Sequence, residues 1–300
     1  MTDNRIKAAV IGAFVADALS LGVHWVYNTG VIDKKLGRVE HYYDPLTSYH
    51  TGKSAGDFTH YGDQTLVLLE SVSSGGGYDA HRFAGMWRTF FADYGGYFDQ
   101  ATKTTLENMD AGRDLTDSAS DSDDLAGASR LAALVSVYHD DLEQLVSAAR
   151  AQTRLTHNDD RGLSSADFFA RTVFAVLGGQ PPQAAMQATL DTHFSDSSIA
   201  SLITMGLESR DRDTRETIAE FGQMCSVEAG LPGAVHLISR YADDFKSAMV
   251  ENVMAGGDSS ARGMLAGMVL GAAHGVVAIP EAWQTGMTAS QRISALLDQL

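Results

Sequence analysis

The stretch Ala255-Gly256-Gly257-Asp258-Ser259-Ser260-Ala261-Arg262-Gly263 leads into an apolar run of small residues from Met264 to Gly275. This run predicts a tightly packed, buried helix. The glycines allow a sharp turn before it, and Asp258 and the serines then lie where unpaired backbone N–H groups gather. The stretch predicts either an ordinary N-cap, or a carboxylate and hydroxyls presented to a metal or a polar ligand.

A second cluster of the same kind lies far away in the chain. Tyr61-Gly62-Asp63-Gln64-Thr65 precedes the apolar residues Leu66-Val67-Leu68-Leu69, so a carboxylate and a hydroxyl again open a predicted helix. Two such clusters are more informative than either one, and together they indicate the two halves of a ligand cleft.

Composition narrows the classes of function. The 300 residues carry a formal net charge of -16 and are 44% hydrophobic, as expected for a soluble globular protein. This acidity argues against nucleic acid and anionic membranes as partners. The single cysteine, Cys225, excludes an internal disulfide, and no signal-peptide pattern opens the sequence, so we expect a cytoplasmic protein.

Helical periodicity dominates the chain and no alternating strand pattern interrupts it. We therefore predict a single all-α domain over residues 1–300. Helices are expected at 5–21, 66–72, 79–94, 125–139, 141–152, 165–177, 182–192, 197–209, 213–225, 230–241, 243–255 and 264–275. Residues 28–54 and 95–124 are expected to be exposed loops, and the aromatic residues of the first either line a cleft or hold that loop down.

Three further polar residues stand out. Asp17 lies in an apolar helix, where a carboxylate is costly unless it is hydrogen-bonded, so it either caps a neighbouring loop or supports a site. His24 follows shortly after it. His157 lies in a polar turn, where a histidine is either a satisfied cap or a catalyst. The acidic run 116–124 is either a solvated loop or part of a cation site.

Taken in order, these motifs resemble the ADP-ribosylglycohydrolase superfamily, which includes dinitrogenase reductase-activating glycohydrolase and the J1 crystallins. The matching segments are Gly12…Ala16-Asp17-Ala18-Leu19, Tyr61-Gly62-Asp63-Gln64-Thr65, Ala128-Ser129-Arg130, Thr156-His157 and Asn252…Gly256-Gly257-Asp258-Ser259. The resemblance implies a compact all-α fold with a cleft for ADP-ribose and usually two Mg²⁺ ions. Carboxylates and hydroxyls at two helix starts hold these ions for cleavage of an N- or O-glycosidic bond.

The chain departs from the family pattern at the metal ligands. Gly62 stands where the family has threonine, and Gln64 and Ser260 stand where it has aspartate. Two carboxylates remain where the family offers four, so we expect one Mg²⁺ ion or none. His24 lies near the position of a family glutamate, so a carboxylate is lost there as well.

The resemblance implies a hydrolase of an ADP-ribosyl or related ribosyl bond, acting on a small molecule or an ADP-ribosylated substrate. The implied metal ligands are Asp63, Asp258 and Ser259, and the two aspartates are also the implied catalytic carboxylates. His24 and His157 are added as catalytic candidates because histidine titrates near neutral pH. The candidate substrate contacts are Asp17, Gln64, Thr65, Gly257, Ser259 and Ser260, with Arg262 added from the balance of charges.

The role of Arg262 and the activity of the protein each stay open at this point. Arg262 either neutralises the two aspartates in place of a metal, binds an anionic group of the ligand, or forms an ordinary salt bridge. The protein is correspondingly a hydrolase, a non-hydrolytic relative like the J1 crystallins, or an enzyme retuned to another ligand. The oligomeric state is left open.

Overall fold

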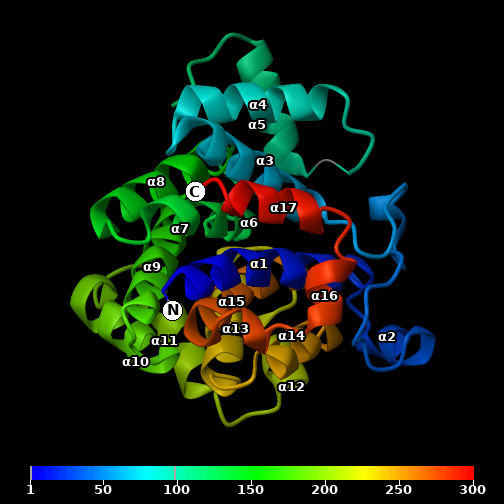
Figure 1. Cartoon of the computed structure of the whole chain (residues 1–300). Helices are drawn as coiled ribbons and strands as arrows, with labels where there is room; N and C mark the ends of the chain where they lie inside the picture. Colours follow the sequence, from blue (N-terminus) through cyan, green and yellow to red (C-terminus); the bar gives the residue numbers. More distant parts are fainter. Residues whose placement is uncertain (1, 98) are drawn as a thin grey trace.

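The computed structural model describes residues 2–97 and 99–300, and over these residues the regular structure is helical (Figure 1). Backbone pairing of the β type is limited in these residues to isolated bridges, such as the one between Val26 and Gly257. The predicted all-α fold is confirmed. No helix in the described part of the chain is long and apolar enough to cross a membrane.

Two helices form the centre of the molecule, α1 (Thr2–Leu21) and α15 (Ser259–His274). Around them lie α3 (His60–Gly75), α4 (Ala80–Ala92), α5 (Gln100–Asp110), α7 (Ala132–Tyr138), α8 (Leu142–Arg154), α9 (Asp160–Leu177), α10 (Pro182–Thr189), α11 (Ala200–Glu208), α12 (Thr214–Phe221), α13 (Val227–Arg240) and α14 (Phe245–Met254). The shorter helices are α2 (Thr29–Lys35), α6 (Ala126–Ser129), α16 (Glu281–Gly286) and α17 (Ser290–Leu297), with single turns at Ser48–His50, Leu190–Phe194 and Val276–Ala278.

Helices α1 and α15 approach each other closely because glycines face their contact. A Cβ on Gly12 would lie 2.3 Å from the carbonyl oxygen of Gly267, and one on Gly267 would lie 2.4 Å from that of Gly12. A Cβ on Gly271 would lie 2.2 Å from the carbonyl oxygen of Ala8. The buried helix predicted from the small-residue run is confirmed, and it is held at backbone contact to α1.

Three predicted segments differ from the structure. The predicted loop 28–54 contains α2, which Asn28 caps and which buries Ile32. The predicted loop 95–124, of which Phe98 lies outside the described residues, contains α5 with a buried face that includes Met109. The helix predicted over 125–139 is split into α6 and α7 around Arg130. Short helices with few buried positions leave too little periodicity for a sequence pattern to detect.

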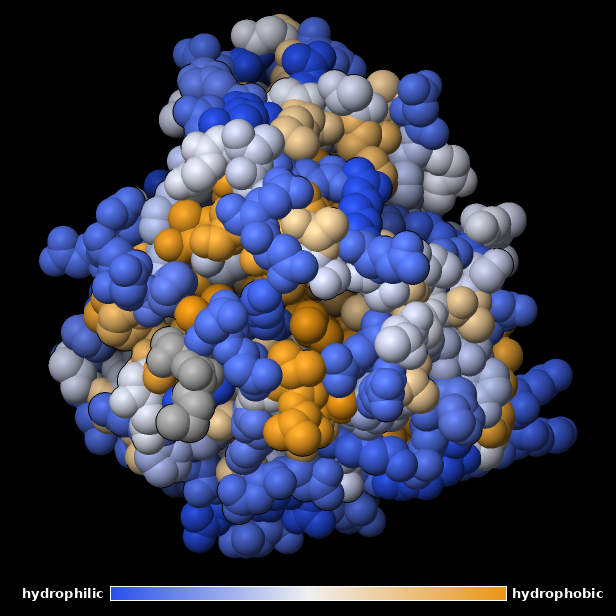
Figure 2. Space-filling model, in the orientation of Figure 1, coloured by the Kyte–Doolittle hydropathy of each residue, from blue (hydrophilic) through white to orange (hydrophobic). Residues whose placement is uncertain are grey.

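Helices α3, α4 and α5 form one end of the molecule, while α9 to α14 gather at the other, with α1 and α15 between them (Figure 1). Figure 2 shows that hydrophilic side chains cover most of the face in view, with apolar side chains confined mainly to its middle. This surface agrees with the strong net charge.

Candidate functional site

The two Gly-Asp clusters lie side by side in the structure. The hydroxyl of Tyr61, in the first turn of α3, donates a hydrogen bond to Oδ2 of Asp258, the N-cap of α15, at 3.0 Å. The hydroxyls of Thr59 and Ser260 are 3.3 Å apart. The starts of two helices, about two hundred residues apart in sequence, are therefore joined by direct side-chain contacts.

Asp17 ties both helix starts to α1. Its carboxylate is fully buried and accepts hydrogen bonds from the backbone N–H of Thr59 at 2.8 Å, from the Thr59 hydroxyl at 2.6 Å and from the Ser260 hydroxyl. Burial raises the pKa of Asp17 from 3.8 to about 7, although these hydrogen bonds favour the charged form. Asp17 thus holds the segment before α3 and the start of α15 together, and its part in a ligand site stays a prediction.

Gly62 has a steric reason to be glycine. A Cβ at this position would lie 2.2 Å from Oδ2 of Asp17 and 2.8 Å from Cβ of Phe58. Real Cβ atoms do not approach other atoms this closely, so the fully buried carboxylate excludes any side chain here.

Asp63 is already paired with a cation. Oδ2 of Asp63 accepts a hydrogen bond from Nζ of Lys53 at 2.5 Å and another from the hydroxyl of Tyr94 at 2.6 Å. Burial raises the pKa of Asp63 above its usual value even though Lys53 acts in the opposite direction. The ammonium of Lys53 also lies 5.5 Å from the centre of the Tyr94 ring, within the range of a cation–π contact.

Asp258 is fully buried at the start of α15. Its carboxylate accepts a hydrogen bond from the backbone N–H of Ala261 at 3.2 Å, and its Oδ1 lies 3.9 Å from Nδ1 of His24. Burial raises the pKa of Asp258, while Arg262 lowers it. Asp258 is therefore the N-cap of α15, as one interpretation of the opening stretch predicts, while its role toward a metal or ligand stays a prediction.

Arg262 is fully buried, and it is not part of a surface salt bridge. Its Nη2 donates to the carbonyl oxygen of Gly256 at 2.7 Å and its Nε donates to Oδ1 of Asn252 at 3.3 Å. Among the described residues no carboxylate lies within 4.0 Å of it, and its Nη1 has no hydrogen-bond partner. Burial lowers the pKa of Arg262 to about 10, and nearby Asp258 opposes this shift.

Gly257 is held by the segment that follows α1. Its N–H donates to the carbonyl oxygen of Val26 at 3.0 Å, and its own carbonyl accepts from the N–H of Trp25 at 2.9 Å. Trp25 has a φ of 61°, a left-handed conformation that is rare for a bulky residue and that often marks functional sites. This conformation places His24 and Trp25 beside the start of α15.

Aromatic rings and histidines form one wall beside these carboxylates. The ring centre of His24 lies 4.5 Å from that of Trp25, 5.3 Å from that of His50 and 6.4 Å from that of His60. Tyr97 lies 4.9 Å from Trp25. The wall consists of His24, Trp25, Tyr49, His50, His60, Tyr61 and Tyr97. Tyr49 is half exposed, so the wall reaches the surface.

Several buried polar atoms in this region have no hydrogen-bond partner among the described residues. They are both ring nitrogens of His24, Nε2 of His50, Nδ1 of His60, the hydroxyl of Ser259 and Nη1 of Arg262. Burial and the neighbouring histidines lower the pKa of His24 well below 6.5, and burial with His60 and Lys53 lowers that of His50 to about 3. Buried unpaired polar atoms are costly, so this cluster favours water or a polar ligand as the partner.

His157 lies further from Asp258 than His24 does. Nε2 of His60 is hydrogen-bonded to Oδ2 of Asp99 at 3.0 Å, and Asp99 also interacts electrostatically with His157. Nδ1 of His157 is hydrogen-bonded to the hydroxyl of Thr156 at 2.8 Å. Burial and Arg130 lower the pKa of His157 to about 4, so this histidine is neutral at pH 7.

The remaining predicted contacts lie at the back of the site. The amide oxygen of Gln64 accepts from Nε1 of Trp87 at 2.9 Å and from Arg130 at 3.1 Å, and the hydroxyl of Thr65 donates to the carbonyl oxygen of Tyr61 at 2.8 Å. These atoms are engaged within the protein core. Direct substrate contacts by Gln64 and Thr65 stay predictions.

Sequence patterns did not identify Lys53, Tyr94, His60 or Asp99 as parts of this region. Lys53 and Asp99 lie in segments without helical period, and their proximity to the site depends on how two loops fold. His60 directly precedes the second cluster, and only its hydrogen bond with Asp99 distinguishes it.

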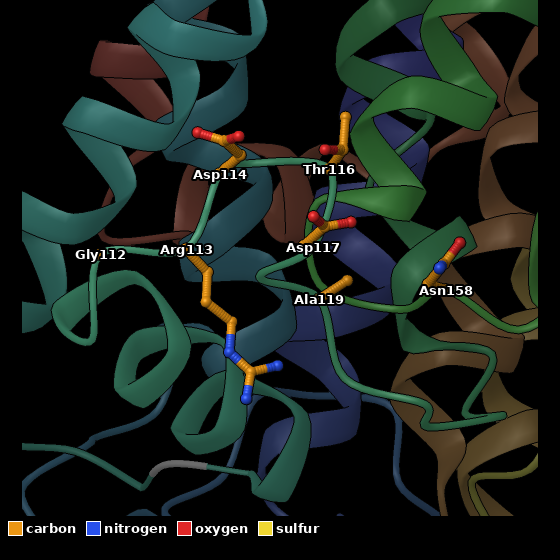
Figure 3. A pocket seen from close by; sticks show the side chains of 7 residues that line it. All are labelled: Gly112, Arg113, Asp114, Thr116, Asp117, Ala119 and Asn158. Carbon is orange, nitrogen blue, oxygen red and sulfur yellow. The ribbon is translucent and has the colours of Figure 1, made fainter.

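An open surface hollow of about 720 Å³ lies away from these residues, on the loop after α5 (Figure 3). Gly112, Arg113, Asp114, Thr116, Asp117, Ala119 and Asn158 line it. Ser118 and Ser120 fix the loop because their hydroxyls donate to backbone carbonyls, including that of Thr156 at 2.7 Å. In the described chain no group of three or more acidic, histidine or cysteine side chains is arranged to hold a metal, and this loop is no exception.

Known proteins identify the scaffold around this geometry. The model of the family described as ADP-ribosylglycohydrolase matches residues 1–300. The chain belongs to the ADP-ribosylglycohydrolase family. It is 24% identical to Crystallin J1A of Tripedalia cystophora over 99% of this chain and 96% of the relative. It is 22% identical to human ADP-ribosylhydrolase ARH3 over 58% of this chain and 56% of the relative.

The chain is also similar to a solved structure named ADP-ribosylglycohydrolase-related protein complex, with a TM-score of 0.78 and 22% identity. The alignment covers 99% of this chain and 97% of the chain in that structure. At this identity the likeness supports the fold alone. Together with the family match, it confirms the resemblance inferred from the sequence motifs.

Members of the ADP-ribosylglycohydrolase family typically bind divalent metal ions, but the residues of this member do not fit a pair of them. Lys53 and Tyr94 share one oxygen of Asp63, and the hydroxyl of Ser260 is directed at Asp17. The amide oxygen of Gln64 is engaged in the core. Mg²⁺ needs several oxygen ligands in octahedral order, and this donor set does not supply them for two ions.

Proposed function

We propose that this member of the ADP-ribosylglycohydrolase family hydrolyses a ribosyl glycosidic bond, of an ADP-ribosyl group or a related riboside. The observation that carries the proposal is the contact between the hydroxyl of Tyr61 and Asp258, which brings the two Gly-Asp clusters together. The family match and the unpaired buried polar atoms beside that contact support it.

The aromatic and histidine wall suits a ligand that carries flat rings and hydroxyl groups. Trp25, Tyr49 and Tyr97 offer ring surfaces near the exterior, and aromatic rings stack on other flat rings. Further in, both ring nitrogens of neutral His24 and Nε2 of neutral His50 have no partner, and ribose hydroxyls can match such donors and acceptors. Ser259 adds a buried hydroxyl.

In the proposed reaction water adds to the anomeric carbon while the bond to the nitrogen or oxygen of the leaving group breaks. The carboxylates of Asp63 and Asp258 favour the positive charge that develops on the sugar. His24 lies 3.9 Å from Asp258, so a proton can pass between them through the ligand or a water and reach the leaving group. His157 interacts electrostatically with Asp99, the hydrogen-bond partner of His60, and acts, in this proposal, on the position of His60.

A non-hydrolytic role is the second candidate, and one observation favours it. Lys53 and Tyr94 both bind the same oxygen of Asp63, so the carboxylate is engaged before any substrate arrives. The similarity to Crystallin J1A extends over nearly the whole chain. Such a relative would keep the scaffold and lose the reaction.

Binding and hydrolysis are tested separately. Calorimetry and thermal shift with ADP-ribose should show saturable binding that D258N weakens at least tenfold, whereas D211N, a change at a highly exposed aspartate, should leave it unchanged. Release of ADP-ribose from ADP-ribosylated peptides should be lost in D258N. Binding without release would support the non-hydrolytic role, and the absence of both would contradict the proposed site.

A further inference from the structure

We infer that Lys53 and Arg262 supply the positive charge that divalent metal ions supply in other members of the family, so that this site holds its ligand without a metal. The inference rests on the proposed function for the place where the ligand binds. It concerns the charge of the site, which can be measured whether or not the protein hydrolyses anything.

Lys53 is placed as a fixed internal cation. Its ammonium lies 2.5 Å from Oδ2 of Asp63, and the two side chains are only 18% and 13% exposed. The backbone N–H of Lys53 donates to the carbonyl oxygen of His50 at 3.1 Å, which anchors the loop that carries it. A metal ion at this oxygen would have to displace both the ammonium and the hydroxyl of Tyr94.

Arg262 supplies positive charge near the second carboxylate, that of Asp258, without a direct contact to it. Its guanidinium is fully buried, is fixed by Gly256 and Asn252, and lowers the pKa of Asp258. Its Nη1 has no hydrogen-bond partner among the described residues, so the buried cation has a donor left for a ligand. A dication bound at Asp258 and the buried guanidinium of Arg262 would repel each other, because the protein interior screens charges only weakly.

The charges of the site balance under this assignment. Two carboxylates, Asp63 and Asp258, are matched by two fixed cations, Lys53 and Arg262. The family pattern balances four carboxylates with two dications. At the metal-ligand positions of the two helix starts, the losses at Gln64 and Ser260 remove two negative charges and the two cations replace the metals, so the charges counted at these positions balance in both arrangements.

Direct metal binding tests the inference. Titration of the wild-type protein with MgCl₂ or MnCl₂ at millimolar concentration should give no saturable heat and no change in Tm, and EDTA should not alter the binding of ADP-ribose. Saturable binding of either metal that D63N abolishes would overturn the inference.

A second measurement tests the role of Lys53 without any ligand. K53M should lower Tm by roughly 2–4 °C or more, because it leaves a mostly buried carboxylate without its cation. K53M/D63N should recover most of that loss, whereas K103M, at an exposed lysine of α5, should change little. Equal effects of K53M in the wild-type and D63N backgrounds would show that the pair is not coupled, and would overturn the inference.

The outcomes also separate this inference from the proposed function. Binding of ADP-ribose only in the presence of a metal would refute the inference and leave the proposed function standing. Coupling of Lys53 with Asp63 in a protein that binds neither metal nor ADP-ribose would refute the proposed function alone.

Discussion

Substitution of Gly62 by alanine distinguishes local helix preference from the packing of this site. Gly62 lies in the first turn of α3, and in an exposed helix glycine is less favourable than alanine by about 1 kcal/mol. Helix preference alone therefore predicts that G62A stabilises the protein. The structure predicts the opposite, because the new Cβ would lie 2.2 Å from Oδ2 of Asp17.

The expected loss of stability follows from the groups that the new methyl group would displace. Forcing a methyl group into a filled core costs about 1–3 kcal/mol. Displacing the Asp17 carboxylate also weakens its three hydrogen bonds to Thr59 and Ser260, each contributing about 1 kcal/mol. After the gain in helix preference, we expect a net loss of roughly 2–4 kcal/mol in the free energy of unfolding.

Urea denaturation of G62A, G85A, D17A and D17A/G62A measures this effect. G85A, in α4, is the matched control, because its Cβ would meet no atom within 4 Å and it should gain up to about 1 kcal/mol. In a D17A background the cost of G62A should fall by at least ~1 kcal/mol, since only the contact with Phe58 then remains. Stabilisation by G62A, or an unchanged cost in D17A, would refute the steric role of Asp17 at Gly62.

Three more predictions concern the scaffold and the buried acids. G267A should cost about 3 kcal/mol or more in urea denaturation, because the new Cβ would lie 2.4 Å from the backbone oxygen of Gly12, which cannot rotate away. The pKa of Asp17 is about 7 in the folded protein, against 3.8 for an ordinary aspartate, so its burial lowers the free energy of unfolding as the pH rises from about 4 to 7, by on the order of 4 kcal/mol. In denaturation series across that range, D17N should flatten the dependence of the free energy of unfolding on pH. An unchanged dependence would contradict the assignment. The pKa of Asp99 is shifted in the opposite direction, below 3.8, because the hydrogen bond and charge of His60 outweigh the effect of burial. D99N should therefore destabilise the protein most at neutral pH, and the loss should shrink as the pH falls below about 4. A loss of stability that does not depend on pH would exclude this origin.

The fold was largely predictable from sequence because its signals are local and repeated. The run from Met264 to Gly275 combines apolar and small residues, and the structure buries it against α1 at glycine contacts. The short helices α2, α16 and α17 were not predicted, since a helix of six to eight residues buries too few positions for its period to be visible.

The site was predictable only in part, for a different physical reason. Asp63 and Asp258 could be paired because each follows glycine at a helix start, and the structure joins their segments through Tyr61. Which side chain pairs with each carboxylate depends on tertiary contacts, which the local sequence pattern does not show. Lys53 reaches Asp63 from a loop without period, and Arg262 contacts Gly256 instead of a carboxylate. A sequence shows which ligands are missing but not which side chains occupy their place.

The substitutions at the site are best understood as one linked change. A buried carboxylate keeps its charge only if an opposite charge or hydrogen bonds stabilise it, so removal of a metal pair would leave four buried carboxylates repelling one another. Replacement of two of them by Gln64 and Ser260 relieves that repulsion and also redirects both side chains into the scaffold, toward Arg130 and Asp17. The two carboxylates that remain then need one cation each, and Lys53 and Arg262 lie where those charges are required. Reversal of one position alone, such as Q64D, should therefore destabilise the site and fail to restore a metal.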